Sequence, residues 1–433
     1  MELKKVNDVR IAIALTVLCI LPSRGILKTD WMALLISGAL LLKDKDYRIS
    51  KIWMSGGAVA YFITQIFFLV FRLEGINSIL QFFMVFVLVP LTIFRRLNTE
   101  DKIRKYLQGL VFLFSIYSII GIFESFTGIN IFELLYGYQI ERFAANEIRF
   151  GLYRSFGLCT VSINNAMLMN IIWCIANYLL CENKKKKTLI IEWGIIGVYT
   201  ILILSKAVMI VAVLSQIVLF MRNMNEGITA KGVFKFTLLI VAVVVILNSN
   251  LVIVKYARNI YIPIINQLLG TSFAYDDTFS AGGFGERFQL VSWVIEELDN
   301  KWLFGVGYQQ KFSHSFIKIS ASGNSSTWYK ESIENTWLYY LYRTGCVGLI
   351  GFMMYQFDCI KKTLKLIKKE VKRNSMSFLM MVVSVAYFFL ILMCFAQEDL
   401  RLYFVLMAVY SAHIQNIRNI NIINRKETTK NVF

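Results

Sequence analysis

The sequence is poor in the residues that most metal centres and many enzyme active sites use. It has only two histidines, His314 and His413, among 433 residues. Proline is also scarce, with three residues. It contains no H-E-x-x-H segment, no phosphate-binding loop of the form G-x-x-x-x-G-K-[ST] and no G-x-S-x-G nucleophile motif. A single histidine in a polar loop is more often a surface residue than a catalytic one. We therefore predict no metal site and no bound cofactor.

Charged residues and paired cysteines are scarce as well. Only 17% of the residues are charged and 57% are hydrophobic, whereas a soluble domain averages about 25% and roughly 45–50%. None of the seven cysteines forms a C-x-x-C pair, so the sequence predicts neither a disulfide framework nor a zinc site. This composition is typical of a chain whose solvent is lipid.

Long apolar segments fill most of the chain. A helix needs about 20 mostly apolar residues to cross roughly 30 Å of hydrocarbon, and the scarcity of proline leaves long helices uninterrupted. We predict an all-α integral membrane protein with about twelve spans, the first of which is a retained anchor. The predicted spans are residues 9–22, 26–42, 52–71, 76–94, 106–124, 155–180, 189–204, 207–221, 233–252, 335–357, 376–396 and 402–417.

The basic residues indicate how the chain is oriented. Lysine and arginine concentrate in alternate segments, namely 1–10, 43–51, 95–105, 181–188, 221–235, 358–374 and 413–433. Cytoplasmic loops carry an excess of these residues, so both termini are predicted to be cytoplasmic. The formal charge of +18 is then explained by topology and does not indicate nucleic-acid binding.

Two predicted outer segments are too long to be turns. Residues 125–154 interrupt the first nine spans, which occupy 1–252, and residues 253–334 form a larger loop before the last three spans and basic tail at 335–433. A loop of this length without obvious strands usually carries function. Its residues 286–298 have apolar side chains at helical spacing, which predicts an amphipathic helix on the outer membrane interface.

Lys206 is one of several charged residues on the predicted outer side. It separates two apolar runs in the sequence Ser205-Lys206-Ala207. A lysine at bilayer depth costs about 2.5–3.5 kcal/mol and usually lines a cavity. It can equally be a turn residue whose ammonium group reaches the lipid headgroups. The charge alone leaves both interpretations open.

The other outer charges lie at the edges of predicted spans. Arg154 follows Arg142 and Arg149, and Arg287 opens the predicted interfacial helix. Glu331 and Glu334 are three residues apart, which predicts that they lie on one helical face where the outer loop re-enters the membrane. Polar asparagines inside a predicted span, such as Asn164 and Asn165, can simply bond neighbouring helices.

Four short motifs occur in a fixed order along the chain. They are Arg154-x-x-Gly157 with Asn164-Asn165, then Ser205-Lys206-Ala207, then Arg287 with Trp293 and Trp302-Leu303-Phe304-Gly305-Val306-Gly307, then Glu334-Asn335-x-x-Leu338 with Gly345-x-x-Gly348-Leu349. This order resembles the O-antigen ligase and Wzy polymerase superfamily over roughly residues 150–350. Three positions depart from the family pattern: Lys206 stands where arginine is usual, Asn164 where proline is common, and Glu334 where the ligases carry histidine.

The resemblance implies a membrane glycosyltransferase of GT-C-like architecture in a bacterial plasma membrane. Its substrate would be an undecaprenyl-diphosphate-linked oligosaccharide on the outer face, and the growing glycan would pass from its carrier to the non-reducing end of the next lipid-linked repeat. Partners of the same pathway would be a chain-length regulator and a flippase. No metal is needed, because a diphosphate is already a good leaving group and requires only cations to hold its charge.

The resemblance also suggests roles for particular residues. Arg154, Lys206 and Arg287 are candidates to bind the diphosphate, with Asn335, Asn165, Arg142 and Arg149 in support. Glu334, or else Glu331, is the candidate base for the acceptor hydroxyl. The missing ligase histidine favours a polymerase. The alternatives are a ligase-like transferase, a lipid-linked oligosaccharide flippase and a purely structural membrane protein. A flippase usually has shorter outer loops, internal repeats and charges near mid-membrane.

Overall fold

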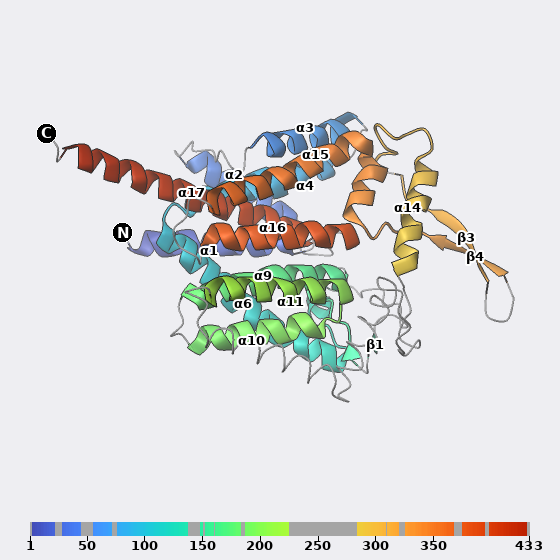
Figure 1. The fold of residues 1–433 in the computed structure, drawn as a ribbon, viewed down its shortest axis with the longest axis horizontal. Coiled ribbons are helices and arrows are strands. Elements are labelled where there is room, and N and C mark those ends of the chain that lie inside the picture. The colour runs from blue at the N-terminus through green and yellow to red at the C-terminus, as the bar shows by residue number, and fades with distance from the viewer. Residues whose placement is uncertain are drawn as a thin grey trace.

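Helices that run side by side dominate the computed structural model of the protein (Figure 1). The structure describes residues 2–21, 28–44, 55–71, 76–136, 148–149, 152–159, 161–182, 187–224, 284–308, 310–319, 325–367, 375–394 and 398–430. The chain begins and ends at one end of the molecule, whereas α14 and the strands β3 and β4 lie at the opposite end (Figure 1). The shared position of the termini fits the predicted topology, and their cytoplasmic location remains a prediction.

The described elements follow one another with short connections in most places. The helices are α1 (Glu2–Ile20), α2 (Thr29–Lys43), α3 (Gly56–Phe71), α4 (Ile76–Phe83), the π-helical turn η1 (Met84–Leu88), α5 (Val89–Arg96), α6 (Glu100–Thr127), α7 (Ile131–Tyr136), α9 (Ser162–Glu182), α10 (Lys187–Leu202), α11 (Lys206–Met224), α14 (Phe284–Leu298), α15 (Thr336–Ile367), α16 (Met376–Met393) and α17 (Glu398–Lys430). The strands are β1 (Ile148–Arg149), β2 (Leu152–Tyr153), β3 (His314–Ile319) and β4 (Ser325–Lys330).

The predicted spans correspond to helices wherever the structure describes them. Four helical stretches are long and apolar enough to cross a membrane within the described residues, and they are Ile76–Arg96, Glu100–Thr127, Ser162–Glu182 and Met376–Met393. The chain is therefore a membrane protein, while the number of twelve spans remains a prediction. The span predicted at 233–252 lies outside the described residues. The span predicted at 155–180 begins later, at Ser162, because the preceding residues form a turn.

Helix α9 lies at the centre of one half of the bundle. It contacts α6, α10, α11, α16 and α17, and almost all of its residues are buried. Its polar side chains find partners inside the protein, as when the Asn177 amide donates to Gln216 Oε1 of α11 over 2.7 Å. Interhelical hydrogen bonds of this kind join helices where no water is present to satisfy polar groups.

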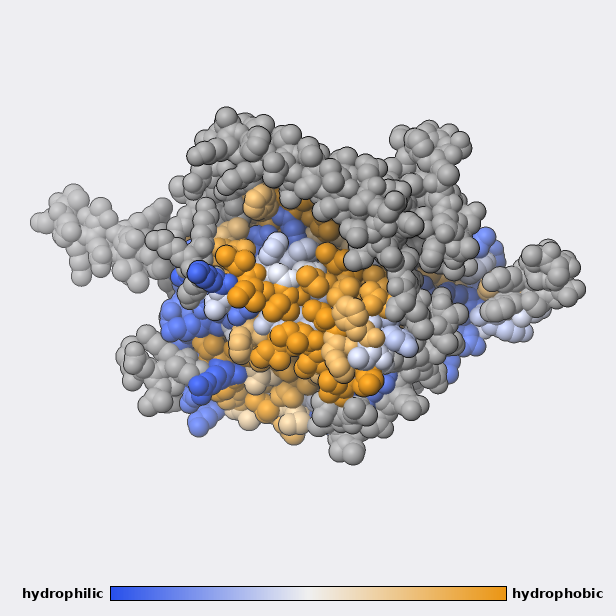
Figure 2. Space-filling model, turned by 90° about the horizontal axis from the view of Figure 1, so that it is seen from below, coloured by the Kyte–Doolittle hydropathy of each residue, from blue (hydrophilic) through white to orange (hydrophobic). Residues whose placement is uncertain are grey.

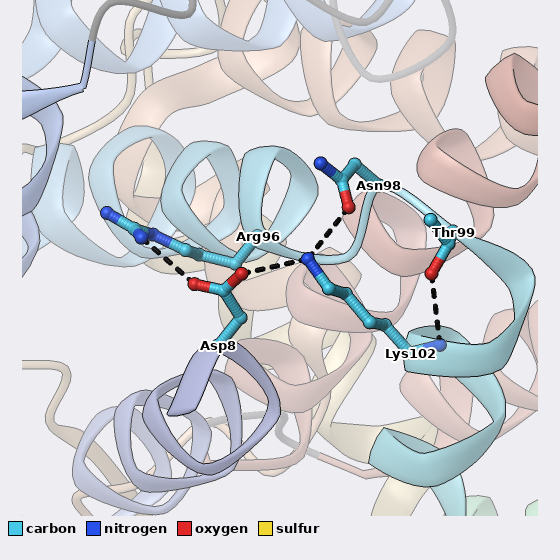
Figure 3. Close-up of polar contacts among 5 residues, drawn as sticks. All are labelled: Asp8, Arg96, Asn98, Thr99 and Lys102. Carbon is cyan, nitrogen blue, oxygen red and sulfur yellow. Dashed lines mark hydrogen bonds and ion pairs between the residues drawn. The ribbon is translucent and has the colours of Figure 1, made fainter. Parts of the chain in front are cut away.

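An ionic cluster joins α1, α5 and α6 near the chain start (Figure 3). The Asp8 carboxylate accepts from Arg96 over 3.0 Å and from Lys102 over 2.8 Å. Lys102 also donates to Asn98, while its backbone N–H is capped by the Thr99 hydroxyl. Burial raises the pKa of Asp8, but the hydrogen bonds and charges of Lys102 and Arg96 outweigh it and hold the pKa below its usual value.

Among the residues that the structure describes, an apolar surface occupies the middle of the face in Figure 2, with hydrophilic residues mainly toward the two ends. Exposed apolar side chains of α6 and α10 belong to such a surface, and they include Phe112, Ile116, Ile119, Phe123, Phe126, Ile190, Ile191 and Val198. A monomeric soluble protein rarely exposes so many large apolar residues together. In a membrane, the same side chains face lipid without cost.

The segments predicted as outer loops contain strands, contrary to the sequence-based expectation of none. β1 pairs with β2, and β3 pairs with β4 in an antiparallel hairpin in which His314 lies opposite Lys330. The sequences of β3 (HSFIKI) and β4 (SSTWYK) do not alternate regularly between apolar and polar residues, so they lack the pattern that normally reveals a strand. The helix predicted at 286–298 is confirmed as α14.

Candidate functional site

Arg154 lies in a turn that a buried carboxylate holds in place. Glu124, in the last turn of α6, is only 2% exposed. It accepts hydrogen bonds from the Ser155 hydroxyl over 2.5 Å and from the backbone N–H groups of Phe156 and Gly157, each over 3.0 Å. Hydrogen bonds to an ionised acceptor are roughly twice as strong as neutral ones. The turn that carries Arg154 is therefore fixed to the end of α6.

Gly157, the glycine of the Arg154-x-x-Gly157 motif, has a steric reason to be glycine. Its φ of 54° lies in the left-handed region, and a Cβ atom at this position would come within 1.9 Å of the Tyr117 hydroxyl. Tyr117 also accepts from the Leu158 N–H over 3.0 Å and donates to Asn165 over 2.6 Å. Any larger residue would force this packing apart.

Asn165 ties the same turn to α10. Its amide donates to the Ser155 carbonyl over 3.2 Å and to the Tyr199 hydroxyl over 2.7 Å. The Tyr199 hydroxyl also lies 2.6 Å from the Ser155 hydroxyl. Asn165 is fully buried, so it supports the turn from inside the protein, which agrees with the interpretation that these asparagines bond neighbouring helices.

Lys206 begins α11 one short turn after α10 ends. The N–H of Ile203 still bonds to the Tyr199 carbonyl, and Leu204 reverses the chain with a φ of 58°. Tyr199 therefore contacts the Arg154 turn with its side chain and the α10–α11 turn with its backbone. The structure brings the backbone segments of Arg154 and Lys206 to the same end of the helices around α9.

Arg287 lies in the first turns of α14, at the end of the molecule where β3 and β4 lie (Figure 1). The buried face of α14 consists of Leu290, Val294 and Leu298. These side chains pack against a cluster of residues from the following loop and α15, namely Val306, Phe312, Ile333 and Tyr342. The part of the apolar face formed by Leu290, Val294 and Leu298 is thus covered by protein, whereas Val291 and Ile295 are exposed, and the location of the helix on the membrane interface stays a prediction.

His314 is not the surface residue that its polar surroundings in the sequence suggest. Its side chain is only 14% exposed and its ring stacks on Trp293 with centroids 5.2 Å apart. Its Nδ1 atom lies 3.1 Å from a carboxylate oxygen of Glu297, and its Nε2 atom lies 3.7 Å from Glu296. The histidine thereby joins β3 to α14.

Helix α15 is broken where the Trp302–Gly307 motif docks into it. Gly345 has a φ of 63° and a ψ of −165°, which no helix contains. The freed backbone groups bond to the docked segment, since Val306 N–H donates to the Tyr342 carbonyl and Cys346 N–H to the Trp302 carbonyl, both over 2.8 Å. A Cβ on Gly345 would meet the Leu303 backbone at 2.4 Å. The two glycine motifs therefore form one structural unit.

Arg343 of α15 binds the backbone at the end of the docked segment. Its guanidinium group donates to the backbone carbonyls of Gly307, Tyr308 and Gln310, and it lies 5.3 Å from the centroid of the Tyr339 ring. Arg343 was missed at the level of the sequence, although a cation inside a predicted span, here 335–357, is a signal that the sequence contains. Glu124 was missed for a similar reason, because it lies at the very end of the predicted span 106–124.

The two candidate bases lie just before α15 in a segment that is not helical. Residues 331–335 have no regular structure, so the prediction that Glu331 and Glu334 share a helical face is wrong. Glu334 pairs with Lys330 over 2.6 Å and its side chain is 48% exposed. Asn335 accepts from the Leu338 N–H over 3.0 Å and donates to the Leu392 carbonyl, so it caps α15 and ties it to α16.

The remaining supporting residues are Arg142 and Arg149. Arg142 lies outside the described residues, and Arg149 lies in β1, where it pairs with Leu152 in the strand register. Within the described part of the chain, no group of three or more His, Cys, Asp or Glu residues has the arrangement of a metal site.

Part of the arrangement described above lies in a segment that matches a known family. Residues 193–353 match the O-antigen ligase family model. The matched residues include α10, α11, α14, the docked Trp302–Gly307 segment and the broken part of α15. The match supports the O-antigen ligase and polymerase superfamily, whose members are membrane glycosyltransferase-like enzymes. No curated protein matches the chain.

Proposed function

We propose that the protein is a polysaccharide polymerase. It transfers a growing glycan from undecaprenyl diphosphate to the non-reducing end of a lipid-linked repeat unit on the outer face of the plasma membrane. The observation that carries this proposal is the match over residues 193–353, because this range contains Lys206, Arg287 and Glu334. The glutamate at position 334, where the ligases carry histidine, favours the polymerase over a ligase.

In this proposal, Arg154, Lys206 and Arg287 bind the diphosphate and stabilise the negative charge that develops on it as the glycosidic bond breaks. Support comes from the position of Lys206 at the first residue of α11. A positive charge at a helix N-terminus is unfavourable by a few tenths of a kcal/mol or more. The stability of α11 therefore does not account for this lysine.

Glu334 is the proposed base that accepts the proton of the attacking acceptor hydroxyl, and Glu331 is the second choice. The Glu334 side chain is 48% exposed, so its carboxylate is accessible to a substrate. The same carboxylate pairs with Lys330. A base must be within hydrogen-bonding reach of the proton that it removes, and an exposed carboxylate just before α15 is open to a substrate that approaches from that end.

The central experiment supplies purified protein in proteoliposomes with a lipid-linked repeat unit and separates the products by size. A polymerase gives a ladder of chains that still partition with the lipid carrier. A ligase moves the glycan to a different acceptor, and a flippase changes only the side on which the substrate lies. A single repeat that crosses the bilayer without extension would refute the proposal in favour of the flippase.

The base is tested by Glu334→Gln and Glu331→Gln in the same assay. Loss of a general base typically lowers the rate by about 10²–10⁴-fold, and we expect this for Glu334→Gln, with single repeats accumulating. Glutamine suits the start of a helix as well, so a merely structural Glu334 would leave extension nearly unchanged. An inactive Glu331→Gln beside an active Glu334→Gln would move the base to Glu331.

A further inference from the structure

An apolar turn is exposed directly after α14. Trp302, Leu303 and Phe304 are 40%, 62% and 47% exposed. The turn is closed by backbone hydrogen bonds, with Gly305 N–H donating to the Lys301 carbonyl over 2.7 Å, so these three side chains are held outward by a formed structure. A contiguous apolar surface that is rimmed by polar residues marks an interaction site.

The turn continues an apolar stripe on α3. Val59, Ile63, Phe67 and Val70 are 38–59% exposed and follow the spacing of one helical face over about 17 Å. The Phe304 ring packs at the end of this stripe, with its centroid 6.4 Å from those of both Phe67 and Phe68. Helix α3 is an apolar helix of a membrane protein, so a stripe of this kind faces lipid.

The polarity of the chain changes abruptly at this turn. Asp299, Asn300 and Lys301 are exposed and polar, and the apolar residues begin at Trp302. Tryptophan is enriched at the boundary between headgroups and acyl chains. Lysine beside it can extend its ammonium group to the phosphates while its methylene groups remain in the apolar layer.

We propose that Trp302, Leu303 and Phe304 insert into the acyl chains of the lipid leaflet at this end of the molecule, with Lys301 at the headgroups. Gly305 and Gly307 follow at once and dock into the break of α15. The inserted turn therefore fixes the depth of this break relative to the headgroups. The insertion does not depend on the proposed polymerase activity.

The test places the photoreactive residue p-benzoylphenylalanine at position 303 or 329 of the full chain in nanodiscs of a single phospholipid. Leu303 and Tyr329 are 62% and 64% exposed, so the two positions are matched in accessibility. After irradiation, mass spectrometry should find phospholipid adducts about tenfold or more abundant at position 303 than at position 329.

Equal adduct yields at the two positions would overturn the proposal. So would a crosslink from position 303 to a second copy of the chain, since the turn would then be an oligomer interface. Substitution of Trp302 by the same photoreactive residue, aromatic for aromatic, provides a second position with the same expected adduct. These yields are measured without substrate, so the result is independent of the proposed enzyme activity.

Discussion

Replacing Glu124 by glutamine should release the turn that carries Arg154. The carboxylate accepts three hydrogen bonds, from the Ser155 hydroxyl and from the N–H groups of Phe156 and Gly157. A glutamine amide has only one acceptor oxygen, so its NH₂ group must face at least one of these donors. The substitution keeps the size of the side chain and changes only its hydrogen bonding.

The magnitude follows from the hydrogen bonds that change. One bond to a charged acceptor is lost, which costs roughly 1.5–3 kcal/mol, and the remaining bonds fall from charged to neutral strength, at about 1 kcal/mol each. The total is about 3.5–5 kcal/mol, and each 1.4 kcal/mol is a factor of ten in the opening equilibrium. We expect hydrogen exchange of the backbone amides at 156–158 to accelerate by about a hundredfold or more.

The assay is hydrogen exchange with mass spectrometry on the protein in nanodiscs, together with glycan extension by the same preparation. Glu182→Gln is the matched control, because Glu182 is 37% exposed and pairs with Arg104 at 3.6 Å. An exposed pair of this kind contributes about 0–1 kcal/mol, so exchange at 156–158 should not change. If Glu124→Gln leaves these amides as protected as in the parent protein, the carboxylate does not hold the turn.

The remaining predictions concern the other parts of the molecule. Gly345→Ala should abolish the docking of the Trp302–Gly307 segment, seen as proteolysis after α14, because its Cβ would lie 2.4 Å from the Leu303 backbone. Asp8→Asn should lower the thermal midpoint at pH 7. The pKa of Asp8 in the folded protein lies below the usual 3.8. The stabilisation of the fold by the Asp8 carboxylate is therefore present above pH 3.8 and is lost as the pH falls through the folded pKa. At that low pH the thermal midpoints of the variant and the parent protein should converge. Extension should be lost in Arg154→Ala, Lys206→Ala and Arg287→Ala and retained in Lys206→Arg, since the related family commonly has arginine there. Full activity of all three alanine variants would remove the proposed diphosphate site. An impermeant thiol reagent on intact cells should label a single cysteine at position 325 and not one at position 186, and the reverse pattern would invert the topology.

The sequence by itself determined that this is a helical membrane protein. Each helix that crosses the bilayer needs about 20 consecutive apolar residues, and repeated apolar segments of this length are typical of membrane proteins. Wherever the structure describes a predicted span, a helix is present, and α14 was predicted to within two residues at its start. The order of the four motifs likewise predicted the superfamily that residues 193–353 match.

Only the tertiary structure decided which contacts the motif residues make. Helix α15 is interrupted at Gly345, because a segment about forty residues earlier supplies the hydrogen bonds that the helix loses there. The Arg154 turn is held by Glu124, Asn165 and Tyr199, which come from three different helices. Local sequence patterns show which residues along one helix or strand face the protein interior. The roles of a buried carboxylate or of a closely packed glycine depend on residues distant in the sequence, which only the packing of the helices brings into contact.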